Sequence, residues 1–307
     1  MKTASRLEKV LEKGAFAVTS ECGPPRGADP DVIREKGALL KGVVDAANIT
    51  DCQTSVVRMS SLASCLILKE MGFDPILQMV TRDRNRIAIQ SDILGAAALG
   101  INNILCLSGD HQRFGDHPQA KNVFDIDSIQ LIMTVKKMRD EGRFLNDDEL
   151  TKPPQLFIGA AANPFADPVE IRALRLAKKA AAGAQFIQTQ CIFNLERFGQ
   201  WMREVVDRGL HEKVAILAGV TPLKSAGMGK YMKNLVPGMD VPDQVIERLK
   251  GVPKEKQSAE GIKMCIESIQ QVREMEGVRG VHIMAIEWEE KVREIAEGAG
   301  LLPRPKV

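Results

Sequence analysis

Aromatic residues are the scarcest class in this sequence. They make up 4% of the 307 residues, with two Trp and one Tyr, which argues against the stacking platforms that bind single-stranded nucleic acid. An excess of one charge is lacking too, because 42 Lys and Arg stand against 40 Asp and Glu, for a formal net charge of +2. So small an imbalance predicts neither a nucleic-acid-binding surface nor a footprint on an anionic membrane.

Long hydrophobic runs are also missing. No apolar run approaches the roughly 18 residues that a membrane-spanning helix needs. The first residues, MKTASRLEKVLEKG, follow an amphipathic helical pattern with mixed charges and lack the apolar core of a signal peptide. We therefore predict an N-terminal helix, no membrane span and a cytoplasmic protein.

Cysteine and histidine are too scattered to indicate a metal centre. None of the six Cys stands in a C-x-x-C motif, and His111 and His117 flank a loop without a ligand partner at helical spacing. The pattern argues against a zinc ribbon or an iron–sulfur cluster within this chain. We expect reduced, buried cysteines, as in a reducing compartment. No G-x-S-x-G motif occurs, which argues against a Ser-His-Asp hydrolase.

Short apolar runs bounded by turn signals recur at regular intervals. They are nearly continuous rather than alternating, as expected of parallel strands buried on both faces. Between them lie segments of helical periodicity, several of which end in Gly. The predicted strands cover residues 15–22, 46–50, 75–80, 103–108, 156–163, 186–191, 214–220 and 281–286.

Eight strands alternating with helices are typical of an α/β fold, the (β/α)8 or TIM barrel. The length fits about 250 residues plus insertions, and we expect residues 1–307 to form a single domain. One insertion covers 143–154; the other is an extra helical insertion between strands seven and eight, from Gly238 to Gly277. A doubly wound Rossmann fold is the alternative, but ECGPPRG after the first strand is not G-x-G-x-x-G.

Polar residues at the predicted strand ends are the candidates for a site, because TIM-barrel active sites lie at the carboxyl ends of the strands. Any one of them could be a loop cap or a solvated rim. Together they favour a pocket for a polar, ring-shaped ligand. In strand order they are Glu21; Asn48, Thr50 and Asp51; Gln78, Thr81, Arg82 and Asp83; Ser108, Gly109, Asp110 and His111; Asn163; Gln188 and Gln190; Thr221 and Lys224; and Glu287.

A basic face is predicted on the helix after strand five. Arg172, Arg175 and Lys179 recur at i, i+3 and i+7 and therefore share one side of that helix. The simpler interpretation is a solvated helix face. Near a barrel mouth, such a face could instead hold a phosphate or pyrophosphate.

Five motifs occur in order between residues 15 and 300: VTSECGPP, ANITDC, LSGD, GAAANP and AKKAAAGAQFIQTQCIF. Together they resemble the methylenetetrahydrofolate reductase family, in its short, bacterial type. The resemblance implies a flavin-dependent barrel, with FAD or FMN, that reduces 5,10-methylenetetrahydrofolate to 5-methyltetrahydrofolate. It also implies NAD(P)H or an iron–sulfur partner subunit as electron donor. We further expect an oligomer, with an apolar helix such as SSLASCLILKEMG as core or subunit interface.

The resemblance assigns roles to individual residues. Glu21 matches the general acid, and burial in an apolar pocket would help it to keep a proton. Asp110 matches an aspartate near both flavin and pterin, and Gln190 a glutamine that contacts folate. Flavin-lining positions correspond to Thr50, Gln78, Ser108, Gly109, Asp110, Asn163, Arg175 and Lys179. The alternative is a non-redox folate binder, such as a methyltransferase component, which would keep Asp110, Asn163 and Gln190 without a flavin.

Overall fold

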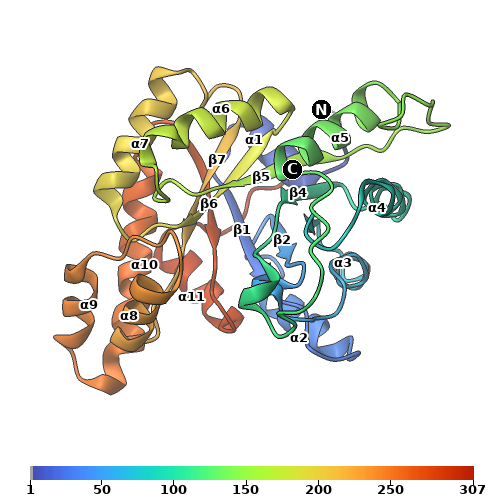
Figure 1. The fold of residues 1–307 in the computed structure, drawn as a ribbon. Helices are drawn as coiled ribbons and strands as arrows, with labels where there is room; N and C mark the ends of the chain where they lie inside the picture. Colours follow the sequence, from blue (N-terminus) through green and yellow to red (C-terminus); the bar gives the residue numbers. More distant parts are fainter. Residues whose placement is uncertain (1–2) are drawn as a thin grey trace.

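The strands form a closed parallel barrel in which each strand pairs with its neighbours in chain order and β8 pairs with β1 (Figure 1). The structure is a computed structural model and describes residues 3–307. Closure removes the exposed edges of the sheet. The strands are β1 (Ala17–Cys22), β2 (Ala46–Ile49), β3 (Pro75–Val80), β4 (Asn103–Leu107), β5 (Phe157–Ala162), β6 (Phe186–Cys191), β7 (Ala215–Val220) and β8 (Val278–Ile283).

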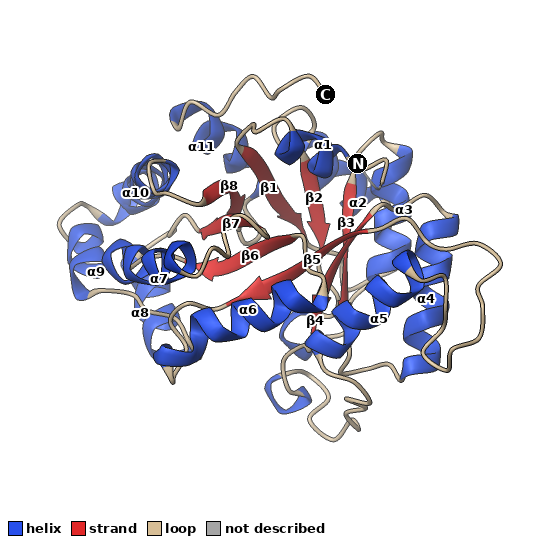
Figure 2. Cartoon of the chain, turned by 90° about the horizontal axis from the view of Figure 1, so that it is seen from above, coloured by secondary structure: helices blue, strands red, loops and turns tan. Residues whose placement is uncertain are grey.

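A layer of helices surrounds the strands (Figure 2). Several begin with a side chain that caps the free N–H groups of the first turn: Asn85 for α4, Asp127 for α5 and Asn194 for α7. The helices are α1 (Arg6–Glu12), α2 (Asp31–Leu40), α3 (Ser61–Glu70), α4 (Arg86–Ala98), α5 (Ser128–Asp140), α6 (Arg172–Ala182), α7 (Leu195–Asp207), α8 (Ala226–Leu235), α9 (Asp243–Lys250), α10 (Gln257–Arg273) and α11 (Val292–Gly298). The predicted (β/α)8 barrel and its N-terminal helix are confirmed.

Helix α1 closes the amino end of the barrel. Its residues Leu7, Val10 and Leu11 pack against apolar side chains inside the barrel, among them Phe157 and Phe186. The rings of these two Phe stack with centroids 5.0 Å apart. This apolar layer occupies the amino end of the barrel, opposite the carboxyl ends of the strands.

The predicted position of the eighth strand was wrong by three residues. We expected it over 281–286, whereas β8 covers Val278–Ile283. Arg279 and Gly280 interrupt the apolar run and resemble a turn in the sequence. In the structure Gly280 pairs with Ala17 of β1, and an added Cβ would lie 2.4 Å from the Ala17 carbonyl oxygen. The predicted strand-end residue Glu287 consequently lies in an exposed loop beyond β8.

The insertion between β7 and β8 also has different bounds from those predicted. Helix α10 packs against β7, β8, α7 and α11, so it belongs to the regular helix layer. The extra element is the pair α8 and α9, which has its own small apolar core around Leu223, Met232 and Leu249. This pair projects to one side of the barrel (Figure 1). Periodicity identifies helices but does not reveal which of them pack on the barrel.

Candidate active site

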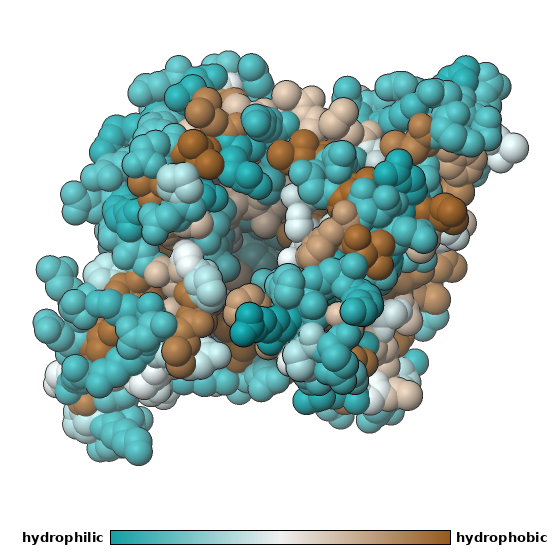
Figure 3. All heavy atoms as spheres, viewed as in Figure 1, coloured by the Kyte–Doolittle hydropathy of each residue, from teal (hydrophilic) through white to brown (hydrophobic). Residues whose placement is uncertain are grey.

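A cavity of about 420 Å³ opens at the carboxyl ends of the strands, a size within the range of about 300–1,000 Å³ that is usual for ligand pockets. Figure 3 shows a hollow near the centre of the molecule in that view. Of the ten residues that the family resemblance assigned to the site, seven line this cavity: Glu21, Gln78, Ser108, Asn163, Arg175, Lys179 and Gln190.

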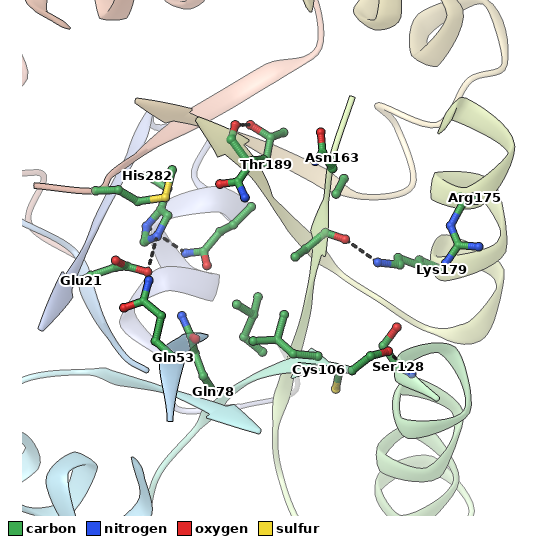
Figure 4. Close-up of a pocket in the computed structure, with 18 of the residues that line it drawn as sticks. Glu21, Gln53, Gln78, Cys106, Ser128, Asn163, Arg175, Lys179, Thr189 and His282 are labelled. Carbon is green, nitrogen blue, oxygen red and sulfur yellow. Dashed lines mark hydrogen bonds and ion pairs between the residues drawn. The ribbon is translucent and has the colours of Figure 1, made fainter. Parts of the chain in front are cut away.

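One end of the cavity is formed by Glu21 and His282 (Figure 4). Glu21 comes from β1, and 16% of its side chain is exposed. His282 comes from β8 and is buried, with its Nε2 3.8 Å from Glu21 Oε1. Gln53, from the loop after β2, lies at the same end in this view. The carboxyl is therefore held at the edge of a polar cluster rather than in bulk water.

Beneath Glu21 lies a layer of buried polar side chains inside the barrel. Asn48 Nδ2 donates to Gln188 Oε1 at 2.6 Å, and Gln188 Nε2 donates to Asn48 Oδ1 at 3.0 Å. Gln188 Nε2 also donates to Thr19 Oγ1 at 3.1 Å. Thr19 Oγ1 lies 2.9 Å from His282 Nδ1. The layer separates the apolar interior of the barrel from the cavity.

The opposite end of the cavity is basic. Arg172, Arg175 and Lys179 of α6 all line it, so the predicted basic helix face is confirmed and it faces the cavity rather than solvent alone. Lys179 Nζ donates to the Ala161 carbonyl oxygen. Burial, and then the neighbouring charge of Arg175, lower the pKa of Lys179 to about 8. The result is a cluster of cations whose electrostatic cost an anionic ligand would relieve.

The amino end of α5 also borders the basic end. Ser128, the first residue of α5, lines the cavity, and its N–H donates to Ser108 Oγ at 3.2 Å. Backbone N–H groups at a helix start favour anions. Apolar side chains also line the cavity, among them Leu105, Leu107, Ala162 and Met284.

Three of the ten residues that the resemblance assigned to the site do not line the cavity. Nine other strand-end candidates also lie outside its lining: Asn48, Asp51, Thr81, Arg82, Asp83, His111, Thr221, Lys224 and Glu287. Asp110 is exposed, and its Oδ2 accepts a hydrogen bond from the Thr54 N–H at 3.2 Å. Gly109 follows β4 with a φ of +87°, a conformation that favours glycine. Thr50 is buried at the end of β2, and its Oγ1 has no hydrogen-bond partner among the described residues. The sequence placed all three at strand ends correctly but could not predict the direction of their side chains.

Thr19 and His282 were missed by the sequence reasoning. Because alternate residues of a strand face the same side, Thr19 faces the barrel interior with Glu21, two positions later. His282 pairs with Thr19 across β1 and β8. A histidine inside an apolar strand was the available signal, but the displaced prediction of the eighth strand directed attention to Glu287.

The cysteines are reduced, as expected. All six are free, and all but Cys52 are buried. Burial raises the pKa of Cys191 and of Cys22 to about 12, so neither forms a thiolate near neutral pH. Within residues 3–307, no group of three or more His, Cys, Asp or Glu side chains is arranged to hold a metal ion. Over the same residues, no helix has the length and apolar character needed to cross a membrane.

Comparisons with known proteins agree with the fold and identify the family. The family model for methylenetetrahydrofolate reductase matches residues 6–300. A Caenorhabditis elegans protein named probable methylenetetrahydrofolate reductase (NADPH) is 22% identical over 96% of this chain, which spans 44% of that relative's length.

Two solved structures share the barrel fold. One, an uncharacterized protein from Clostridium thermocellum described as binding two copies of 5-methyl-5,6,7,8-tetrahydrofolic acid, superposes with a TM-score of 0.64 at 14% identity and covers 96% of this chain and 97% of its own. A 2,3-dimethylmalate lyase superposes with a TM-score of 0.52 at 13% identity over 98% of this chain and 86% of its own. The match of the family model over nearly the whole sequence shows that the chain belongs to the methylenetetrahydrofolate reductase family.

Proposed function

We propose that this chain is a flavin-dependent reductase that converts 5,10-methylenetetrahydrofolate into 5-methyltetrahydrofolate, with residues 1–307 acting as one domain. The observation that carries the proposal is the cavity, which has the Glu21 carboxyl at one end and the cations of α6 at the other (Figure 4). Family membership supports it, as do the name of the C. elegans relative and the methyltetrahydrofolate bound by the C. thermocellum barrel.

The cavity fits a flavin, as FAD or FMN. Its apolar walls suit a planar ring, and its basic end suits a phosphate group. A bound reduced flavin would supply the hydride. We propose that it is held by Thr50, Gln78, Ser108, Gly109, Asp110, Asn163, Arg175 and Lys179.

Glu21 is the proposed general acid. Its carboxyl lines the cavity, and only 16% of its side chain is exposed, so a ligand bound in the cavity lies within reach of it. Transfer of that proton to a ring nitrogen of the folate would break a C–N bond and open the five-membered ring. The resulting iminium carbon is the hydride acceptor. Glu21 becomes a carboxylate in this step and must regain a proton for the next turnover.

Gln190 and Asp110 are proposed to contact the folate. Gln190 lines the cavity, and its Oε1 accepts the Cys191 N–H at 3.1 Å, which leaves its amide NH₂ able to donate to a ligand. The Asp110 carboxylate is turned toward Thr54. Contact between Asp110 and a ligand therefore requires rotation of the Asp110 side chain or movement of its loop.

The test of this function starts with the visible spectrum and with reconstitution by FAD and by FMN. A colourless protein that takes up neither flavin would contradict the proposal and favour a non-redox folate binder such as a methyltransferase component. Turnover of methylenetetrahydrofolate should then be assayed with NADH, NADPH and a reduced viologen in parallel. Turnover with the viologen alone would indicate a partner electron-transfer subunit.

Replacement of the proposed acid gives the sharper test. Glu21→Gln should lower turnover by about 10²–10⁴-fold, the usual contribution of a positioned acid, while flavin still binds and is still reduced. Glu290→Gln, an exposed position beyond β8, is the matched control and should behave like the wild type. Near wild-type turnover of Glu21→Gln would show that another group supplies the proton.

A further inference from the structure

The buried layer beneath Glu21 restricts where protons can lie. Asn48 and Gln188 exchange two hydrogen bonds through their amides. One N–H of Gln188 is therefore used by Asn48 Oδ1. The Gln188 NH₂ group has two protons and no acceptor lone pair. Its second N–H donates to Thr19 Oγ1 at 3.1 Å, and His282 Nδ1 lies farther from it, at 3.4 Å.

The hydrogen bond from Gln188 to Thr19 also determines which nitrogen of His282 carries the proton. Since Thr19 Oγ1 accepts from Gln188, its single proton is free to be donated. Two acceptors are near: His282 Nδ1 at 2.9 Å and the Val281 carbonyl oxygen at 3.4 Å. The shorter separation favours Nδ1. A ring nitrogen that accepts a hydrogen bond carries a lone pair, so the proton of a neutral His282 lies on Nε2.

The Nε2–H group is on the side of the ring that faces Glu21. The two atoms His282 Nε2 and Glu21 Oε1 are 3.8 Å apart, which is beyond a normal hydrogen bond but within reach of a small movement of the Glu21 side chain. Thr19, Asn48, Gln188 and His282 are all at most 3% exposed. In so buried a setting, a donor directed at a carboxylate interacts with it more strongly than in water.

We propose that the Asn48–Gln188–Thr19 chain fixes His282 in the Nε2–H tautomer, and that His282 thereby stabilises the Glu21 carboxylate formed when Glu21 gives its proton to the substrate. The proposal rests on the proposed function. In the step itself, the proton leaves Glu21 for the folate nitrogen and the C–N bond breaks. His282 retains its own Nε2 proton. His282 and Thr19 are positioning residues, since they act through Glu21.

The tautomer can be measured without any turnover. Nitrogen-15 spectra of histidine-labelled protein distinguish protonated from unprotonated ring nitrogens, and a His282→Gln variant assigns the signals among the four histidines of the sequence. We expect an unprotonated Nδ1 and a protonated Nε2 for His282 in the protein at pH 8. A proton on Nδ1 would overturn the proposal.

Two variants of Thr19 link the tautomer to the reaction. Thr19→Val keeps the shape but removes the nearer donor to Nδ1, leaving only Gln188 Nε2 at 3.4 Å, and should weaken the preference for the Nε2–H tautomer. Loss of one hydrogen bond to a charged group is worth about 1.5–3 kcal/mol, so kcat should fall by about 10- to 100-fold with KM little changed. Thr19→Ser restores the hydroxyl and should restore both the tautomer and kcat.

The control is Asn103→Leu, a buried amide on β4 that pairs with Ser5 far from Glu21. It should lower stability without changing the His282 signals. Wild-type kcat and tautomer in Thr19→Val would refute the positioning role. The predicted tautomer in a protein that does not reduce methylenetetrahydrofolate would refute the proposed function and the role of His282 in it, but not the hydrogen-bond assignment.

Discussion

At the scale of single residues, Glu21 and Lys179 impose opposite requirements on one cavity. Glu21 sits above a hydrogen-bonded layer formed by amide and hydroxyl groups and by the His282 ring. Lys179 lies beside Arg175 and the start of α5, where a bound anion would be stabilised by the positive charges. This separation lets one end of a ligand be held by charge while the other meets a proton donor.

Lys179 makes anion binding at the basic end depend on pH. Because burial lowers the pKa of Lys179 to about 8, the side chain is charged at pH 7 and mostly neutral at pH 9. If only the charged lysine binds the phosphate, the affinity for FMN, measured by calorimetry, should fall by about tenfold between these two pH values. The reason is that protonating Lys179 one pH unit above its pKa requires about 1.4 kcal/mol. Lys179→Arg should abolish this dependence and Lys178→Arg, on the exposed side of α6, should keep it. An equal dependence of FMN affinity on pH in the wild type and both variants would contradict the role of Lys179 in binding the phosphate.

At the scale of elements, patterns in the sequence predicted about half of the residues that line the cavity. Seven strands could be located because each is a short, nearly continuous apolar run between turn residues. The strand ends then indicated Glu21, Asn163 and Gln190. The eighth strand was displaced because Gly280 is needed for close approach to β1, a constraint that involves a residue more than 260 positions away. For the same reason His282 and Thr19 could not be paired from the sequence.

Strand β5 contains a glycine, Gly159, that leaves room for a neighbouring side chain. A Cβ added to Gly159 would lie 2.2 Å from an atom of the Phe186 ring, and both residues face the barrel interior. Gly159→Ala should lower the free energy of unfolding by about 1–3 kcal/mol, the usual cost of overpacking, as measured by urea titration. Gly95→Ala in α4, where an added Cβ meets nothing within 4 Å, should instead raise it by about 0.4–1 kcal/mol. Combining Gly159→Ala with Phe186→Leu should restore part of the lost free energy of unfolding. If it does not, the destabilisation by Gly159→Ala does not come from contact with the Phe186 ring.

At the scale of the whole molecule, helix α1 and the last residues of the chain meet at the amino end of the barrel. Helix α1 closes the amino end, and the segment after α11 returns to the same side (Figure 2). Asp45 joins them: its carboxylate accepts hydrogen bonds from Arg304, from Arg6 and from the Val18 N–H of β1. This cluster lies at the opposite end of the barrel from the cavity, so its contribution should be to stability rather than to catalysis.

Asp45 gives a test of that division. Its side chain is fully buried and that of Arg304 is 7% exposed, so Asp45→Ala leaves a buried guanidinium and a strand N–H without their acceptor. Removal of one partner of such a pair costs about 3–5 kcal/mol, which should appear as a lower free energy of unfolding in urea. Asp31→Ala, which breaks an exposed pair with Arg34 in α2, should cost far less. Flavin affinity and kcat, measured at a temperature where Asp45→Ala remains folded, should match the wild type. A loss of flavin affinity in Asp45→Ala alone would mean that the amino end of the barrel is coupled to the cavity.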